Sequence, residues 1–257
     1  MARSAILENN ALFAGADRGL AAALRVLERI AAALDAHLVD GTARQIELAD
    51  LDAAALRIID DALGEGEVVI DLTDGERTRI VEATMAGVWR VHPAARDYEA
   101  LPGCVEVAGF PGRARAALER STRTDFAIEL DEVYVSGTMN AMPVLAEVRD
   151  HAERYRPGCP GTAVNIGRLP MSPTDENLIN RALGDGPVQA TCRGYGISRA
   201  ASTGCRNVWR VRHFNADERM LANVIEIVDV PEIVAAPEED IRDGVNALAD
   251  AIAAYAP

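Results

Sequence analysis

Two stretches of the chain show the apolar spacing of amphipathic helices. In residues 24–38 (LRVLERIAAALDAHL) the apolar side chains recur three and four positions apart, which places them on one face of a helix. Residues 144–158 (VLAEVRDHAERYRPG) have the same spacing and end in Pro157-Gly158, a helix stop. We therefore predict a helix in each stretch.

A third helix is predicted by its end signals in residues 171–186 (MSPTDENLINRALGDG). Ser172 suits the N-cap, Pro173 suits the first helical position, and Glu176 places an acid in the first turn. Gly184 supplies the stop at the other end.

Between the helices, short apolar or alternating runs are typical of strands. Thr73-Asp74-Gly75-Glu76 lies between two such runs and has the composition of a hairpin turn. The runs that predict strands are 43–48 (ARQIEL), 67–72 (EVVIDL), 78–84 (TRIVEAT), 88–91 (VWRV), 104–110 (CVEVAGF) and 163–169 (AVNIGRL).

The chain aligns with itself at an offset of 120 residues, so that residues 24–111 lie on residues 144–231 without a gap. The VWRV quartet recurs whole, at 88–91 and 208–211, and Trp89 and Trp209 are therefore expected in the core or in the packing between the repeats. Solenoid repeats have periods of about 20–50 residues, so a unit of this length indicates a pair of domains.

The predicted fold is α+β, a tandem duplication of a helix-strand-helix unit followed by an antiparallel β-meander. Five segments follow from the alignment: an N-terminal segment (1–23), a degenerate first repeat (24–111), a connecting segment (112–143), a second repeat (144–231) and a C-terminal helix (232–257). The connecting segment contains FAIEL and EVYVSG, which are candidate strands.

The two copies differ in two stretches, where the second copy has more arginine and aromatic residues than the first. CRGYG at 192–196 replaces LTDGE at 72–76, and RVRHFN at 210–215 replaces RVHPAA at 90–95. Arg and Tyr dominate interface hot spots, and glycines permit positive φ and close approach of another backbone. The predicted partner-binding residues are Arg193, Gly194, Tyr195, Gly196, Arg199, Arg210, Arg212, His213 and Asn215. The alternative is a tight turn with a packed tyrosine.

Composition narrows the classes of function. The 257 residues carry a formal charge of −14, which argues against nucleic-acid binding because phosphate recognition needs clustered cations. No apolar run has the length of a membrane span, and the N-terminus does not read as a secretory signal. We expect a cytoplasmic protein.

The cysteines have no metal-ligand spacing and are expected to be thiols. No nucleotide-binding, metalloprotease or nucleophile-elbow motif occurs, so we predict no catalytic residues, no metal and no cofactor. The open alternative is a metal- or thiol-handling protein that uses Cys192, Cys205 and His213.

Residues 182–236 resemble the C-terminal region of the HupH/HyaF family of hydrogenase expression and formation proteins. The resemblance is carried by RGYG (193–196), NVWRVRHFN (207–215) and IEIVDVPE (225–232), and residues 140–155 resemble the segment ahead of that region. In the family RGYG is commonly followed by Asn-Cys-Arg, whereas this chain has Ile197-Ser198-Arg199 and a cysteine before the motif, Cys192.

This resemblance implies a non-enzymatic accessory protein or chaperone in the maturation of [NiFe] hydrogenase. The implied partner is an immature hydrogenase subunit, with the iron–sulfur small subunit favoured, together with other maturation proteins. The acidic composition is compatible with holding the basic, twin-arginine leader of that subunit. A paralogue recruited to another pathway is the remaining alternative, because the motif after RGYG is altered.

Overall fold

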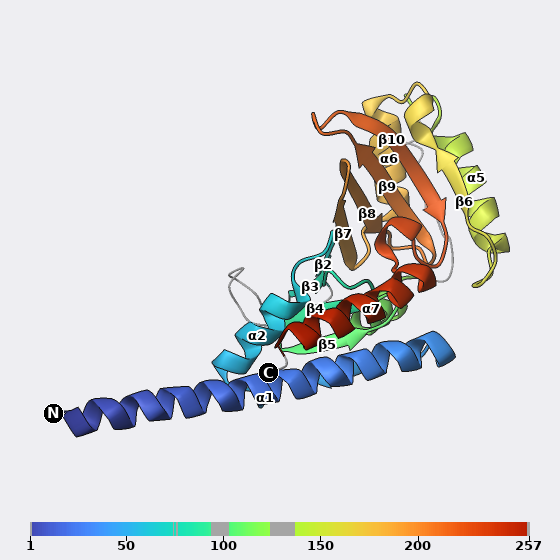
Figure 1. The fold of residues 1–257 in the computed structure, drawn as a ribbon. Coiled ribbons are helices and arrows are strands. Elements are labelled where there is room, and N and C mark those ends of the chain that lie inside the picture. The colour runs from blue at the N-terminus through green and yellow to red at the C-terminus, as the bar shows by residue number, and fades with distance from the viewer. Residues whose placement is uncertain (1, 74, 76, 94–102, 124–136, 256–257) are drawn as a thin grey trace. The chain divides into compact units, whose positions relative to one another are not determined.

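The computed structural model describes residues 2–73, 75, 77–93, 103–123 and 137–255, and the side chains of 2–17 and 93 lie outside the description (Figure 1). The chain divides into two compact units. Unit 1 comprises Met1–Gly66, Thr78–Gly112 and Ala236–Pro257, and unit 2 comprises Glu67–Arg77 and Arg113–Ala235. Within the described residues no helix is long and apolar enough to cross a membrane.

Unit 1 combines helices with an antiparallel sheet. Its strands lie in the order β1-β5-β4-β3, and α1 contacts both α2 and α7. Its core contains Leu27 and Ile30 from α1, Ile59 from α2 and Trp89 from β4, all of them buried. The elements are α1 (Ala2–Asp40), β1 (Arg44–Glu47), α2 (Ala53–Leu63), β3 (Thr78–Glu82), β4 (Val88–Pro93), β5 (Cys104–Val107) and α7 (Glu238–Tyr255).

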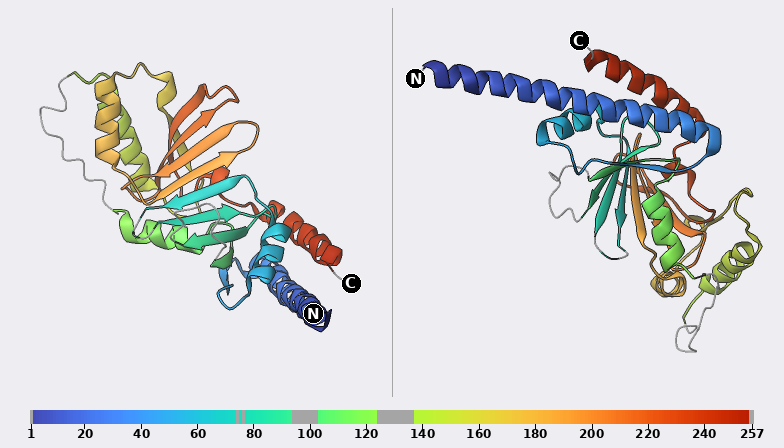
Figure 2. Two further views of the ribbon diagram at one scale, coloured as in Figure 1. Left: turned by 90° about the vertical axis from the view of Figure 1, so that its left-hand side faces the viewer. Right: turned by 90° about the horizontal axis from the view of Figure 1, so that it is seen from below.

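Unit 2 contains the strands in the order β2-β7-β8-β9-β10-β6, with antiparallel neighbours. Helices α5 and α6 lie together on one side of this sheet (Figure 2). The elements are β2 (Val68–Leu72), α3 (Gly112–Ser121), α5 (Ala141–Arg154), β6 (Thr162–Asn165), the 3-10 helix η1 (Ile166–Arg168), α6 (Pro173–Leu183), β7 (Val188–Arg193), β8 (Ile197–Ser202), β9 (Val208–Phe214), β10 (Met220–Ile227) and the 3-10 helix η2 (Glu232–Val234).

The two halves of the sequence form equivalent elements in the same order. Helix α2 and strands β2 and β4 begin 120 residues before α6, β7 and β9. The pairing of β4 with β5 has the register of β9 with β10, since Val88 faces Val107 and Val208 faces Ile227. The outer pairs differ by two residues: Ile46 and Val164, not Ile166, face the equivalent residues Val105 and Ile225.

The end signals of α6 are confirmed in detail. Ser172 is the N-cap, Pro173 is the first helical residue and Gly184 is the C-cap. The reciprocal partner in the capping box is Asp175, not Glu176, because Asp175 stands three residues after the cap, where its carboxylate reaches back to Ser172.

Helix α1 is longer than the predicted helix 24–38, since it begins at Ala2. Residues 2–23 are rich in alanine and leucine and contain no proline, and such a sequence favours helix. Residues 166–168 form a 3-10 turn rather than the end of a strand, and the connecting segment 112–143 contributes helix α3, which was not predicted. The FAIEL and EVYVSG stretches and two residues of the Thr73–Glu76 turn lie wholly or mainly outside the described residues.

Candidate functional site

One end of unit 2 brings together the tips of two hairpins. Strands β7 and β8 are joined by residues 194–196, and β9 and β10 are joined by residues 215–219. Because β8 and β9 are antiparallel neighbours, with Ile197 opposite Phe214, both tips lie at the same end of the sheet. In Figure 1 this end is uppermost in unit 2.

Three of the predicted arginines lie on the face of this sheet that α5 and α6 cover. Arg199 faces Arg212 directly across β8 and β9, and Arg193 faces Ile197 one pleat nearer the tip. All three side chains are exposed, and the Arg199 guanidinium carbon lies 5.1 Å from the centre of the Phe214 ring. The strand register therefore gathers these cations at one end of one face.

Tyr195 projects from the β7–β8 tip and is fully exposed. The alternative of a packed tyrosine is therefore wrong. The backbone makes room for the turn at Gly196, where a Cβ would overlap the carbonyl oxygen of Phe214. Neither Gly194 nor Gly196 has a positive φ, so the turn does not use the left-handed conformation that glycine permits, while the close backbone approach is confirmed at Gly196.

Exposed apolar side chains flank the arginines. Met220 is 53 % exposed and faces Phe214 across the strands, and the adjacent Leu221 is 69 % exposed. Leu169, which follows η1, and Met139, which precedes α5, are exposed at the same end of the unit. Large exposed apolar patches on soluble proteins mark interaction sites. We call Arg193, Tyr195, Arg199, Arg212, Phe214, Met220 and Leu221 the hairpin-end surface.

Two of the predicted binding residues stabilise the fold instead. The Arg210 guanidinium donates to the carbonyl oxygens of Asn180 and Gly184 at the end of α6, and burial lowers its pKa. The Asn215 side chain closes the β9–β10 turn by accepting from the backbone N–H groups of Asp217 and Arg219. Both side chains are therefore engaged within unit 2.

His213 lies on the opposite face of the sheet from Arg199 and Arg212. Its Nδ1 lies 2.9 Å from Ser198 Oγ, and Ser198 faces Cys192 on the next strand. Cys192 and His213 are thus separated by two strand spacings, about 10 Å, with Ser198 between them. This spacing does not support a pair in which His213 acts directly as the base for Cys192.

The three residues of the alternative thiol or metal site do not come together. Cys205 is buried beyond the far end of β8, where its thiol lies 3.7 Å from the carbonyl oxygen of Leu183. Ser198 and Ser202 are about 13 Å apart along the strand, and Cys205 lies further on. All four cysteines are thiols, and the described residues contain no group of three potential metal ligands.

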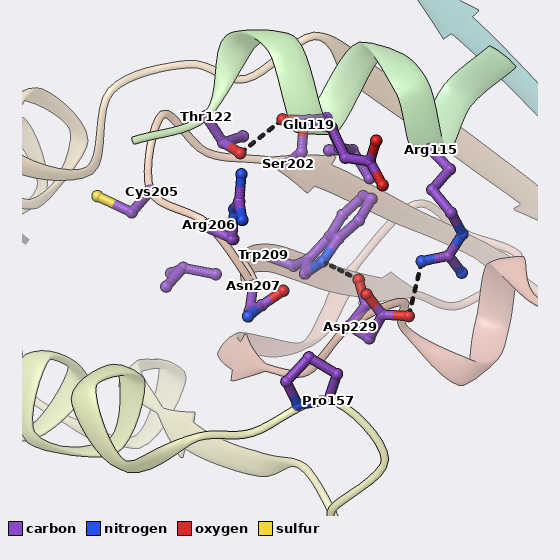
Figure 3. A pocket seen from close by; sticks show the side chains of 12 residues that line it. Arg115, Glu119, Thr122, Pro157, Ser202, Cys205, Arg206, Asn207, Trp209 and Asp229 are labelled. Atoms are coloured by element: carbon purple, nitrogen blue, oxygen red, sulfur yellow. Dashed lines mark hydrogen bonds and ion pairs between the residues drawn. The ribbon is translucent and has the colours of Figure 1, made fainter. Parts of the chain in front are cut away.

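A pocket of about 230 Å³ lies at this far end of unit 2, between α3 and the β8–β9 turn. Figure 3 shows Arg115 and the Trp209 indole both directed at Asp229. Arg115 forms an ion pair of 2.9 Å with the Asp229 carboxylate, and the indole Nε1–H of Trp209 donates to the backbone carbonyl oxygen of Asp229. Since these polar groups satisfy one another, we place the candidate site at the hairpin end.

A buried carboxylate, that of Asp175, lies between the beginnings of α5 and α6. Oδ1 of Asp175 accepts the backbone N–H groups of Met139, Asn140 and Ala141 at the start of α5, and Oδ2 accepts from Ser172. Burial alone would raise the pKa of Asp175, but these hydrogen bonds outweigh it and hold the pKa well below its usual range. Asp175 therefore ties the beginnings of α5 and α6 together.

Sequence reasoning missed the apolar part of the surface. Met220 and Leu221 stand together at the start of a strand, where the alternation that predicts a buried face is interrupted. The irregular pairing between Met220 and Ala222 marks this interruption in the structure. Two successive large apolar residues beside a turn were the available signal.

Comparison with known proteins gives a consistent answer. The model of the HupH hydrogenase expression protein C-terminal conserved region matches residues 20–133 and 138–255. The hydrogenase expression/formation protein HupH of Rhizobium leguminosarum bv. viciae is 37 % identical, covering 90 % of this chain and 81 % of its own. HoxQ of Azotobacter vinelandii, which bears the same description, is 36 % identical over 88 % of this chain and 79 % of its own.

The hydrogenase-1 operon protein HyaF of Escherichia coli is 30 % identical over 82 % of this chain and 73 % of its own. A solved structure of the hydrogenase expression protein HupH from Thiobacillus denitrificans is 30 % identical, with a TM-score of 0.42, and covers 45 % of this chain and 96 % of its own. The chain belongs to the family of HupH hydrogenase expression proteins.

Proposed function

We propose that this protein is a non-enzymatic maturation factor that holds an immature [NiFe] hydrogenase subunit before assembly or export. The family supports a role in hydrogenase maturation. The observation that carries a binding role is the hairpin-end surface, where Tyr195, Met220 and Leu221 are exposed together beside arginines. Burying apolar and aromatic side chains of this size is a main source of affinity in protein interfaces.

The proposed client is the iron–sulfur small subunit, and the proposed compartment is the cytoplasm. Both follow from the resemblance to hydrogenase expression and formation proteins. The surface is presented by the ends of paired strands, so the backbone that carries it is held by strand pairing before the client binds. Such preorganisation reduces the entropy lost on binding.

We further propose that the chain arose by tandem duplication and that the two copies have since diverged in role. The 120-residue offset between equivalent elements and the two matches of one family model support this history. At the positions of Arg193, Tyr195 and Arg212 the first half has Thr73, Gly75 and His92. The first half therefore keeps one arginine of the hairpin-end surface, as Arg79 at the position of Arg199, and lacks Arg193, Tyr195 and Arg212.

The proposed function predicts a stable complex with a subunit precursor. The tagged chain, produced together with the precursor of the small subunit, is expected to co-purify with it and to leave the large-subunit precursor behind. Size-exclusion chromatography with mass spectrometry measures this directly. Failure of the chain to retain either precursor would remove the proposal, and retention of the large subunit alone would change the client.

A further inference from the structure

The guanidiniums of the hairpin-end surface are not paired with carboxylates in the part of the chain that the structure describes. Arg193, Arg199 and Arg212 form no ion pair and no side-chain hydrogen bond with any described part of the chain. Glu67 stands opposite Arg193 across β2 and β7, and Asp217 and Glu218 lie in the β9–β10 turn, but none of these carboxylates lies within ion-pair distance of the three guanidiniums. In a protein with a net charge of −14, Arg199 and Arg212 are thus two neighbouring cations without a carboxylate partner among the described residues.

The pairing of two of these arginines is unfavourable for the isolated sheet. Arg199 and Arg212 stand directly opposite each other, and like charges in that arrangement destabilise paired strands. The first half has Arg79 opposite His92 at the equivalent position, and both of those residues have partners. The β-meander therefore does not require two unpaired arginines, and a bound anionic group would relieve their repulsion.

The apolar side chains lie at the same end of the sheet as the charges. Phe214 is covered on one side by the Arg199 guanidinium, and Met220 faces it from β10. Tyr195 and Leu221 extend the apolar area at the tips of the two hairpins. A partner that fills this surface must offer apolar side chains and negative charge within a few residues of each other.

Resting on the proposed function, we propose that the hairpin-end surface binds a segment of the immature subunit that carries large apolar side chains next to carboxylates. Arginine matches carboxylates with paired hydrogen bonds, so such a segment satisfies the cations while its apolar groups cover Tyr195, Met220 and Leu221. A basic leader with paired arginines would be repelled by the same guanidiniums. The leader is therefore not what this surface holds.

Replacing the three arginines by glutamates tests this inference, because the direction of the change in affinity shows whether the bound segment is acidic or basic. The variant Arg193→Glu/Arg199→Glu/Arg212→Glu is compared with Arg154→Glu/Arg156→Glu/Arg206→Glu, which makes the same change in net charge on exposed arginines at the opposite end of unit 2. The Kd for the subunit precursor is measured by isothermal titration calorimetry at low and high salt. We expect about 100-fold weaker binding for the surface variant and less than about 3-fold for the control.

Each other outcome overturns the inference. Tighter binding by the surface variant would mean that a basic segment occupies the surface, and unchanged binding would mean that the client lies elsewhere. A single-stranded RNA oligomer and phosphatidylglycerol vesicles serve as further probes. Binding of either through the three arginines, without binding of the precursor, would assign the surface to RNA or lipid. If the wild-type chain binds no subunit, the proposed function falls as well; if only the reversal has no effect, the proposed function stands.

Discussion

Replacing Tyr195 and Arg193 together by alanine is expected to abolish retention of the hydrogenase subunit and leave the fold intact. Tyr195 is fully exposed and Arg193 is exposed without a side-chain partner among the described residues, so neither replacement removes an internal contact. Truncating a hot-spot tyrosine or arginine costs about 2 kcal/mol or more of binding free energy, and two together weaken binding by about 100-fold or more. Pull-down and titration calorimetry measure the loss.

The matched control is Arg154→Ala, which removes an exposed arginine from the far end of α5. It is expected to retain the subunit with nearly wild-type affinity, because its ion pair with Asp150 is a surface pair worth at most about 1 kcal/mol. Thermal unfolding of both variants should match the wild type. Intact retention by the double variant would remove the hairpin-end surface from the binding site.

Asp175→Ala is expected to destabilise unit 2 by about 3–5 kcal/mol. The substitution leaves the backbone N–H groups of Met139, Asn140 and Ala141 without their shared acceptor and breaks the capping box with Ser172. Urea unfolding in a Trp89→Phe background, followed through the fluorescence of buried Trp209, measures the loss.

The matched control for this effect is Asp52→Ala in the first half. Asp52 caps α2, the equivalent of α6, with a single bond to the backbone N–H of Ala55, so its loss is expected to cost about 1 kcal/mol. Equal costs for the two substitutions would show that Asp175 is an ordinary helix cap and does not join α5 to α6.

The contribution of Asp175 also depends on pH with a definite sign. The pKa of Asp175 is lower in the folded state than in the unfolded chain, where it is about 3.9. Its stabilisation is therefore fully present above the unfolded pKa and is lost as the pH falls through the folded pKa. The difference in unfolding free energy between wild type and Asp175→Ala should be constant from neutral pH to about pH 5 and shrink below about pH 4.

Much of the fold was predictable from the hydrophobic periodicity of the sequence and from the helix end signals. The caps of α6 and the strands that contain the VWRV quartets were predictable because they depend on neighbouring residues alone. The start of α1 was misplaced because the prediction began the helix where the internal alignment begins, although residues 2–23 are themselves helix-forming.

The candidate site was only partly predictable, because membership depends on which face each residue occupies. Alternation along β9 places Arg212 and His213 on opposite faces of the sheet. Arg210 lies on the face of Arg212, but its guanidinium donates to a carbonyl oxygen at the end of α6. The structural role of Arg210 could have been inferred from the repeat, because an arginine also stands at the equivalent position in the first half. That residue, Arg90, makes an ion pair with Asp60 of α2. Because Arg90 and Arg210 each contact the helix of their own copy, this pair is better explained by the common fold than by a function of one copy.

The central claim is that the hairpin end of the second half is the part of the chain that touches the client. Site-specific photo-crosslinking tests it most directly, with p-benzoylphenylalanine replacing Tyr195 in one protein and Val39 in another. Val39 is the matched position because it is an apolar side chain in unit 1 that is 88 % exposed. We predict a crosslink from position 195 to the hydrogenase subunit and none from position 39. A crosslink from position 39 alone, or from neither position while the subunit still co-purifies, would contradict the account.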